Sequence, residues 1–321
     1  MSRNWIRAAS LQVGDGGGRT VDLSQLRIRF LIRQWTTQTT NPGEFRVYNL
    51  SDETAHAIAG KGSEFKHLRF SAGYEGNIGV IYKGSVLQSR IGRETPTDTF
   101  VDFYCRDGDE AYNWGVVNKT FAAGSTQRDH VDEVLRVFKK LGVTGEGTIK
   151  GLSKKKYPRA VTLYGMGRDV MRTIAQSNGA TWNILNGELN HIPNDDKGKS
   201  SGAFVLNANT GLIGMPQETV DGIIVTALLN PQFKLNTQLI INEKSIQRAA
   251  WGQNAGVGAE ATAGQLDTLG TADGTYRIIS IEWRGDSRGQ EWYATMICYG
   301  AKTGAPPISS TGIVGQSSAG G

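Results

Sequence analysis

The chain has 321 residues, of which 38% are hydrophobic and 20% are charged, and its formal net charge is +5. This length and composition predict a globular protein of two or three domains and argue against wholesale disorder. The mild positive charge does not by itself indicate a nucleic-acid partner.

The first third of the chain alternates apolar and polar residues in the pattern of short β-strands. Strands are expected at residues 26–30, 45–48, 68–72, 79–87 and 99–105. One short helix is expected after the second strand, because Ser51 can cap its start and Gly60 suits its end. The 42 glycines, well above an average usage of about 7%, indicate many tight turns between strands. This third therefore predicts a small barrel or sandwich.

The middle third changes to a helical period. A helix capped by Thr126 or by the serine before it, and running through Leu141, carries an apolar stripe at helical spacing. A second helix is expected at about residues 168–177. Next, Asn186-Gly187 lies between two strand-like runs, which is the strongest short signal for a hairpin. This third therefore predicts an α+β insertion.

The last third returns to β-strands, which are expected at residues 222–229, 239–241, 276–281 and 292–299. Residues 249–274 are rich in glycine and alanine and are expected to form a long loop. Residues 304–321 contain little besides Gly, Ser and Pro, so we expect a tail that is disordered or that orders only on a partner.

The predicted fold class is mainly β with an α+β insertion, in which two β-barrel domains flank a mixed α/β region. The basis is the change of hydrophobic period from two to 3.6 and back. The expected division is a first β-barrel domain at 1–110, an α+β insertion at 111–211, a second β-barrel domain at 212–305 and a flexible tail at 306–321.

Membrane and disulfide signals are weak. No window approaches the ~18 apolar residues of a membrane span. The first seven residues lack the apolar stretch of a signal peptide, so synthesis in a bacterial cytoplasm is expected. Two cysteines, Cys105 and Cys298, cannot make a disulfide framework, and both are expected to be buried free thiols.

The nucleophiles, acids and potential metal ligands of the chain show no catalytic pattern. The sequence has no HExxH, CxxC, GxSxG or Walker motif. None of the four histidines has a Cys, Asp or Glu at a known metal spacing. Acidic residues are plentiful, but no pair is set in an apolar stretch as a glycosidase requires. We therefore expect no catalytic, cofactor-binding or metal-binding residues, no cofactor and no enzymatic activity.

Two features have a binding alternative. Gly165-Met166-Gly167 joins a strand to a helix, the setting of an anion site, but Val170 occupies the place of the third glycine, which favours a plain turn. The basic cluster between Lys150 and Arg159 contains Tyr157 as its only aromatic residue, whereas a nucleic-acid platform needs several stacking rings. A solvated loop, or a face that forms salt bridges with another subunit, is the preferred interpretation.

Three segments resemble the baseplate hub proteins of tailed bacteriophages, including Mu-like and related contractile-tail hubs. The first is residues 41–54, with Tyr48-Asn49-Leu50-Ser51 before a short helix; the second is residues 211–216 with 222–231; the third is residues 274–279 with 285–293. Together they extend from residue 41 to 299. The chain departs from the family at Asn236, where glycine is frequent, and at Trp283, where histidine is frequent.

The resemblance implies a homotrimeric ring that adapts the hexameric tail tube to the trimeric central spike and leaves a channel for DNA. It implies as partners the tube protein, the spike protein and also the tape-measure protein and baseplate wedge proteins, with DNA only in transit and no membrane. The expected location is the baseplate of the virion tail.

Two other functions remain open from the sequence. A tail-associated cell-wall hydrolase would need an apolar cleft with a perturbed acid, or a Cys/His pair. A nucleic-acid-binding protein, suggested by the pI of about 9.1 and the lysine cluster, would bind DNA with strong salt dependence.

Overall fold

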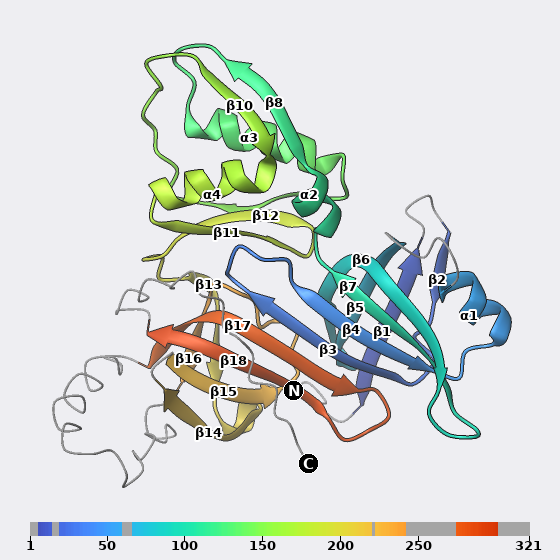
Figure 1. The fold of residues 1–321 in the computed structure, drawn as a ribbon. Helices are drawn as coiled ribbons and strands as arrows, with labels where there is room; N and C mark the ends of the chain where they lie inside the picture. Colours follow the sequence, from blue (N-terminus) through green and yellow to red (C-terminus); the bar gives the residue numbers. More distant parts are fainter. Residues whose placement is uncertain (1–5, 15–18, 60–65, 220–221, 242–273, 301–321) are drawn as a thin grey trace, which may run out of the picture.

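A computed structural model describes residues 6–14, 19–59, 66–219, 222–241 and 274–300 (Figure 1). Within them the fold is mainly β, with a mixed α/β insertion, as the sequence predicted. The tail predicted at residues 304–321, and all but the last residue of the loop predicted at 249–274, lie outside the described residues.

Most strands of the described chain belong to one large sheet of 13 strands. In chain order they are β1 (Arg7–Gly14), β2 (Thr20–Asp22), β3 (Ile28–Trp35), β4 (Pro42–Tyr48), β5 (Lys66–Tyr74), β6 (Asn77–Arg93), β7 (Thr99–Arg106), β13 (Lys199–Leu206), β14 (Leu212–Thr219), β15 (Gly222–Leu228), β16 (Thr237–Ile241), β17 (Thr275–Asp286) and β18 (Trp292–Gly300). The spatial order is β14-β15-β18-β17-β3-β4-β7-β6-β5-β1-β2, and β16 joins β13 to β17.

The first and last parts of the chain meet in the middle of this sheet. Strand β3 pairs with β17 in antiparallel register, from Trp35 opposite Ser280 to Arg29 opposite Asp286. Figure 1 shows the two strands, blue and red, side by side. Segments that are about 250 residues apart in sequence therefore share one hydrogen-bonded seam, which the sequence alone did not predict.

One hydrophobic core lies behind this sheet, because alternate residues of each strand point to the same side. In β3 the inward residues Ile28, Phe30 and Ile32 are at most 4% exposed. Phe30 packs against Phe70 of β5, with ring centroids 4.6 Å apart, and against Trp292 of β18 at 5.3 Å. Burying each large apolar side chain stabilises the fold by about 1.5–3 kcal/mol.

The sheet curls around this core, so that its β1 end approaches the turn between β17 and β18. The Arg7 guanidinium donates a hydrogen bond to the carbonyl of Gln290 at 2.7 Å. The indole N–H of Trp292 donates to the carbonyl of Gly73 in β5 at 3.2 Å. These contacts join strands that are far apart in the order of the sheet.

Helix α1 (Asp52–Ala59) confirms the short helix predicted in the first third. Its start is capped as expected, since the Ser51 hydroxyl accepts a hydrogen bond from the backbone N–H of Thr54 at 3.3 Å. Ala55 and Ile58 are buried in the main core. Gly60, expected to follow the helix, lies outside the described residues.

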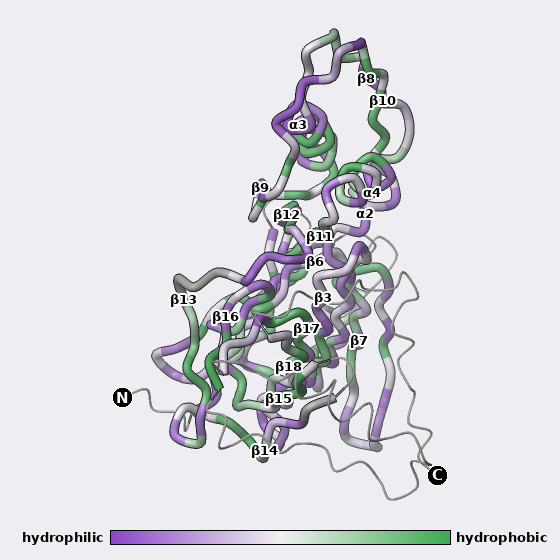
Figure 2. Tube along the Cα trace, turned by 90° about the vertical axis from the view of Figure 1, so that its left-hand side faces the viewer, coloured by the Kyte–Doolittle hydropathy of each residue, from purple (hydrophilic) through white to green (hydrophobic). Residues whose placement is uncertain are grey.

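The insertion projects from the main sheet as a separate layer of helices and short strands (Figures 1 and 2). Its elements are α2 (Asp109–Trp114), β8 (Val116–Phe121), α3 (Gln127–Lys139), β9 (Gly145–Ile149), β10 (Val161–Met166), α4 (Gly167–Ser177), β11 (Ala180–Leu185) and β12 (Glu188–Pro193). Strands β8 and β10 form one small sheet, and β11, β12 and β9 form another. The core of the insertion is its own and includes Phe138, Met171 and Trp182. A single 3-10 turn, η1 (Ala208–Thr210), follows β13.

The structure confirms the predicted cap of the first long helix of the insertion and the predicted hairpin turn. Thr126 and Asp129 form a capping box at the start of α3. Asn186 and Gly187 have φ of 53° and 80°, the positive values of a two-residue hairpin turn. The predicted end of α3 was slightly too late, because the helix stops at Lys139 and the chain then turns.

Several short elements were not predicted, among them β1, β2, α2, β8, β9, β13 and β14. Helix α2 has only six residues, so it offers less than two turns of periodicity. Among the described helices, none is long and apolar enough to cross a membrane.

A candidate interaction face on the main sheet

The outward side of the main sheet carries several charged side chains, which alternate along each strand with residues buried in the core. In β3, Arg29 and Arg33 point out, because they alternate with the buried residues Ile28, Phe30 and Ile32. In β4 the same alternation places Glu44 and Arg46 outward, and in β7 it places Asp102 outward. We call this surface of β17, β3, β4, β7 and β6 the charged face.

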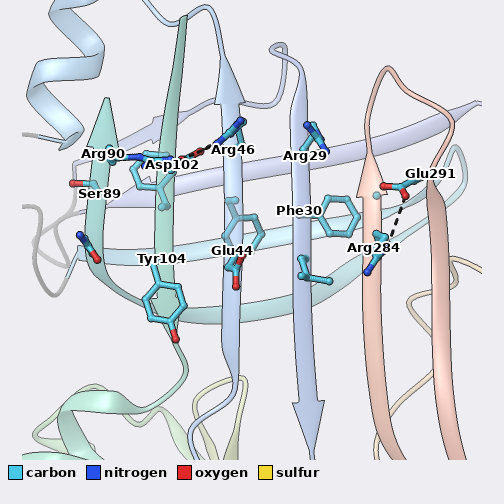
Figure 3. A pocket seen from close by; sticks show the side chains of 15 residues that line it. Arg29, Phe30, Glu44, Arg46, Ser89, Arg90, Asp102, Tyr104, Arg284 and Glu291 are labelled. Carbon is cyan, nitrogen blue, oxygen red and sulfur yellow. Dashed lines mark hydrogen bonds and ion pairs between the residues drawn. The ribbon is translucent and has the colours of Figure 1, made fainter. Parts of the chain in front are cut away.

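Strand register aligns some of these side chains in a row across the sheet. Arg29 lies opposite Arg46, which in turn lies opposite Asp102. Asp102 also lies opposite Arg90 of β6. Figure 3 shows Arg90, Asp102, Arg46 and Arg29 following one another across neighbouring strands. The row depends on long-range pairing, since its members are up to 73 residues apart (102 minus 29).

Asp102 is the centre of an ion-pair cluster on this face. Its carboxylate accepts hydrogen bonds from Arg46 at 2.7 Å and from Arg90 at 2.8 Å. Burial alone would raise the pKa of Asp102, but these hydrogen bonds lower it below its ordinary value. Arg46 also lies over the ring of Phe100, 3.9 Å from the centroid. Asp102 therefore stays ionised and fixes two arginines in place.

The charged face contains a hollow of about 780 Å³, shown in Figure 3. Its charged lining residues are Arg29, Arg46, Arg90, Arg284, Glu44, Asp102 and Glu291. Four cations against three carboxylates leave the lining close to neutral, with one excess positive charge. Such a surface can face a polyanion without holding it tightly, because the repulsive and attractive contacts nearly cancel.

Two further salt bridges join charged side chains of the first part of the chain to carboxylates of β17. Arg27 forms a salt bridge with Asp286 at 2.6 Å, and Arg33 forms one with Glu282 at 2.9 Å. Both pairs cross the β3–β17 seam, and they join the first part of the chain to the last. Because these arginines are more than 40% exposed, each pair contributes about 1 kcal/mol or less.

A second cavity, of about 420 Å³, lies between the main sheet and the insertion. Asp107 is the only acid among the described residues that line it. Burial raises the pKa of Asp107 to about 8, although hydrogen bonds from the backbone N–H groups of Gly187 and Asn186 oppose this. This is the perturbed acid that a hydrolase would need, and the sequence did not point to it. It has no second carboxylate beside it in the cavity, as two-carboxylate hydrolysis requires.

The two cysteines lie where the sequence placed them. Cys105 and Cys298 are both fully buried in strands and are not disulfide-bonded. Burial raises the pKa of both thiols, which disfavours the reactive thiolate.

The histidines are dispersed, and two are buried. His130 is enclosed between the rings of Phe121 and Tyr157, at 4.7 and 4.9 Å, and its pKa is lowered by burial. His191 donates from Nδ1 to the carbonyl of Lys150 at 2.7 Å, since a carbonyl can only accept. Among the described residues no cluster of three or more His, Cys, Asp or Glu side chains could hold a metal ion.

Gly167, the last glycine of the predicted turn, begins α4, as expected for a plain strand-to-helix connection. Its N–H donates to the carbonyl of Gly115 at 2.7 Å, so this donor does not point to an anion.

The mainly β architecture with a projecting α/β insertion is a fold known from phage tails. Neither a family model nor a curated protein matches the sequence. Solved structures do match. The 43 kDa tail protein of prophage MuSo2 from Shewanella oneidensis has 11% identity and a TM-score of 0.56, over 92% of this chain and 98% of that one.

Two further structures share the fold. A tail protein from Neisseria meningitidis has 9% identity and a TM-score of 0.55, over 94% of this chain and all of that one. The Escherichia coli c3393 protein has 10% identity and a TM-score of 0.54, over 90% of this chain and 76% of that one. It is described as a component of the type VI secretion system, with structural similarity to the T4 bacteriophage tail proteins gp27 and gp5. At these identities the likeness is one of fold.

Proposed function

We propose that this chain is a structural protein of a bacteriophage tail and, within the tail, the baseplate hub. The observation that carries the proposal is the shared fold, which extends over at least 90% of the chain in three solved structures. Two of these are named as tail proteins, and the third is described as similar to T4 tail proteins. The sequence resemblance to hub proteins, based on three segments in the expected order, supports the same assignment.

In this proposal three copies form a ring that joins the hexameric tail tube to the trimeric spike. The regions 1–110 and 212–305 act as two similar β domains, so three chains together present six such domains. Residues 111–211 form the insertion, and residues 306–321 form the tail. The β3–β17 seam supports this, because it holds the first and last parts of each chain in one continuous sheet. A subunit built in this way presents one rigid face to its neighbours.

The charged face would line the channel through which DNA passes. Its near balance of four arginines and three carboxylates supports this role, because strongly basic walls would hold DNA by counterion release. The hub would act without enzymatic activity, cofactor or metal. Its partners would be the tube protein, the spike protein, the tape-measure protein and the surrounding wedge proteins, within the virion tail.

Mass measurement and electron microscopy test the proposal. The purified chain alone should have a mass near three times its 34.7 kDa, and its complex with the spike protein should contain three copies of the chain. Both should appear as a ring with a central channel. A chain that stays monomeric both alone and with its spike, and is absent from assembled tails, contradicts it. Zymography on cell-wall substrate tests the absence of hydrolysis, since clearing that is lost on changing Asp107 to Asn would establish an enzyme.

A further inference from the structure

The end of the insertion farthest from the main sheet is a two-stranded ribbon (Figure 1), and apolar side chains are exposed on it. Strands β8 and β10 pair only with each other among the described residues, from Val161 opposite Phe121 to Met166 opposite Val116. Each strand therefore has one edge whose backbone N–H and C=O groups have no strand partner in the described chain. Such edges readily accept an added strand.

One side of this ribbon is uncharged and open. Its inner side faces α3, where Lys119 pairs with Glu133 at 2.9 Å. The opposite side presents only uncharged residues: Val116, Asn118, Thr120, Thr162, Tyr164 and Met166. Tyr164 is 79% exposed and Val116 is 53% exposed, and nearby Trp114, at the end of α2, is 66% exposed. Large apolar side chains exposed together on neighbouring elements indicate a contact surface.

The basic cluster predicted from the sequence lies at one end of this ribbon. Tyr157 exchanges backbone hydrogen bonds of 2.8 Å with the turn that follows β8, at Gly124 and Ser125. The cluster therefore lies next to the start of β10. Its four exposed cations form no ion pair with any described residue: Lys154, Lys155, Lys156 and Arg159. This contrasts with Lys150, which pairs with Asp196 at 2.8 Å.

We propose that the β8–β10 ribbon binds an extended, acidic segment of another protein, which adds a strand to its free edge. The unpaired cations select acidic residues at one end of that segment, and Tyr164 with Val116 provides apolar contacts along the rest. This inference goes beyond the proposed hub function and does not depend on it. A segment of about six residues would match the length of the ribbon.

A protein partner fits this surface better than a nucleic acid does. Tyr157 is the ring closest in sequence to the cations, and it is stacked on His130 with centroids 4.9 Å apart. It is therefore not free to stack on a base, as single-stranded nucleic acid would need. The exposed Tyr164 lies on a strand with an open edge, where backbone pairing is available to a polypeptide.

Peptide binding to the full chain tests the proposal. The probe is a fluorescein-labelled peptide of roughly ten residues, with glutamates at one end and alternating valine and threonine elsewhere, made in both chain orders. Fluorescence anisotropy should show binding that weakens with salt, and the same peptide with lysines should not bind. Hydrogen exchange should slow in residues 116–121 or 161–166 when the acidic peptide is bound, because edge amides become paired.

Matched variants assign the effect to this surface. The double change Lys154→Gln and Lys156→Gln should weaken binding by about tenfold. The control, Lys140→Gln and Lys234→Gln, removes the same charge from exposed, unpaired lysines elsewhere and should change affinity by less than about twofold. Tyr164→Thr should weaken binding while the salt dependence stays the same. Because the Tyr164 side chain is 79% exposed, the change should leave the fold intact.

Three outcomes would overturn the proposal. The first is equal weakening by both lysine pairs, since binding would then follow overall charge. The second is a single-stranded DNA probe that binds through Lys154 and Lys156 while the acidic peptide does not bind. The third is self-association of the chain that Tyr164→Thr abolishes without any peptide binding, because the occupant would then be a second copy. The first two outcomes do not bear on ring formation or on the channel, whereas the third would place a contact between copies of the chain at the ribbon.

Discussion

The buried carboxylate of Asp107, at the end of the main sheet, accepts a hydrogen bond from the backbone N–H of Asn186 in the hairpin turn of the insertion. Its other oxygen accepts from the N–H of Gly187 at 3.0 Å. The Asn186 side chain in turn accepts from the N–H of Lys83 in β6 at 3.1 Å. These hydrogen bonds form a clamp that holds the β11–β12 hairpin against the main sheet. The clamp therefore fixes the position of the insertion on the sheet.

Replacing Asp107 with Ala should destabilise the chain by about 2–5 kcal/mol, because two buried backbone N–H groups lose their acceptor. Chemical denaturation monitored by tryptophan fluorescence measures the change. The control is Asp109→Ala on the neighbouring helix, which should cost clearly less because Asp109 accepts only from the Asn113 side chain among the hydrogen bonds described. Equal losses for the two variants would show that Asp107 is no clamp.

The same residue should make stability depend on pH. The pKa of Asp107 is raised to about 8 in the folded chain, whereas its ordinary value is 3.8. The folded state therefore holds a proton that the unfolded state releases, so this contribution is present below about pH 4 and is lost as the pH rises towards 8. Unfolding free energies of the wild type and Asp107→Asn should converge or cross over this window; a difference that grows in favour of the wild type with rising pH contradicts the prediction.

A buried hydrogen-bond chain crosses the β3–β17 seam. The indole N–H of Trp283 donates to the Gln34 side-chain oxygen at 3.1 Å, and the Gln34 amide donates to the carbonyl of Ile81 at 2.8 Å. Gln34→Leu should cost about 2–4 kcal/mol, since it leaves a buried donor and a buried acceptor unpaired. A double-mutant cycle with Trp283→Phe should give a coupling free energy of about 1 kcal/mol or more. Additive losses would mean that the two side chains do not act together.

Asn236 has φ of 60°, a left-handed conformation in which the hub proteins that this chain resembles frequently have glycine. Its N–H donates to the carbonyl of Ile278 at 2.9 Å, which fixes the turn before β16 against β17. Asn236→Gly should therefore change stability by less than about 1 kcal/mol, whereas Asn236→Val should cost about 1–2 kcal/mol. Thermal unfolding compares the two, and equal melting temperatures would refute the conformational explanation.

The charge balance of the charged face can be altered without touching the core. Glu44→Lys with Glu291→Lys adds four units of positive charge to a lining that has one in excess. We expect the variant to retain duplex DNA in a mobility-shift assay at low salt and to release it as salt rises, while the wild type binds weakly throughout. Phage that carry the variant should eject DNA more slowly. Unchanged DNA retention would separate this face from the proposed channel.

Local features of the fold were predictable from sequence because their causes are local. The capping of α1 by Ser51 and of α3 by Thr126 depends on residues three positions away. The turn at Asn186 depends on the residues that tolerate positive φ. The alternation of residues 26–30 correctly predicted a strand, although the strand observed, β3 (Ile28–Trp35), begins and ends later.

The candidate site was not predictable in the same way. Arg29, Arg46 and Asp102 look like ordinary outward residues of three separate strands, and only register brings them into one row. Alternation on its own could have shown that each is exposed, but nothing local specifies which strand lies beside which. For the same reason, Asp107 gave no sign of its raised pKa, which comes from burial under a hairpin some 80 residues later.

The sequence by itself determined the period of each segment, its caps and its turns, and from these the mainly β fold with an α/β insertion. Tertiary structure alone decided the β3–β17 seam, the charged face and the clamp at Asp107. The physical reason is that helix and turn signals arise from interactions between near neighbours in the chain. Strand partners are chosen by the packing of a shared core, where Phe30 meets Phe70 and Trp292 across distances that no local pattern encodes.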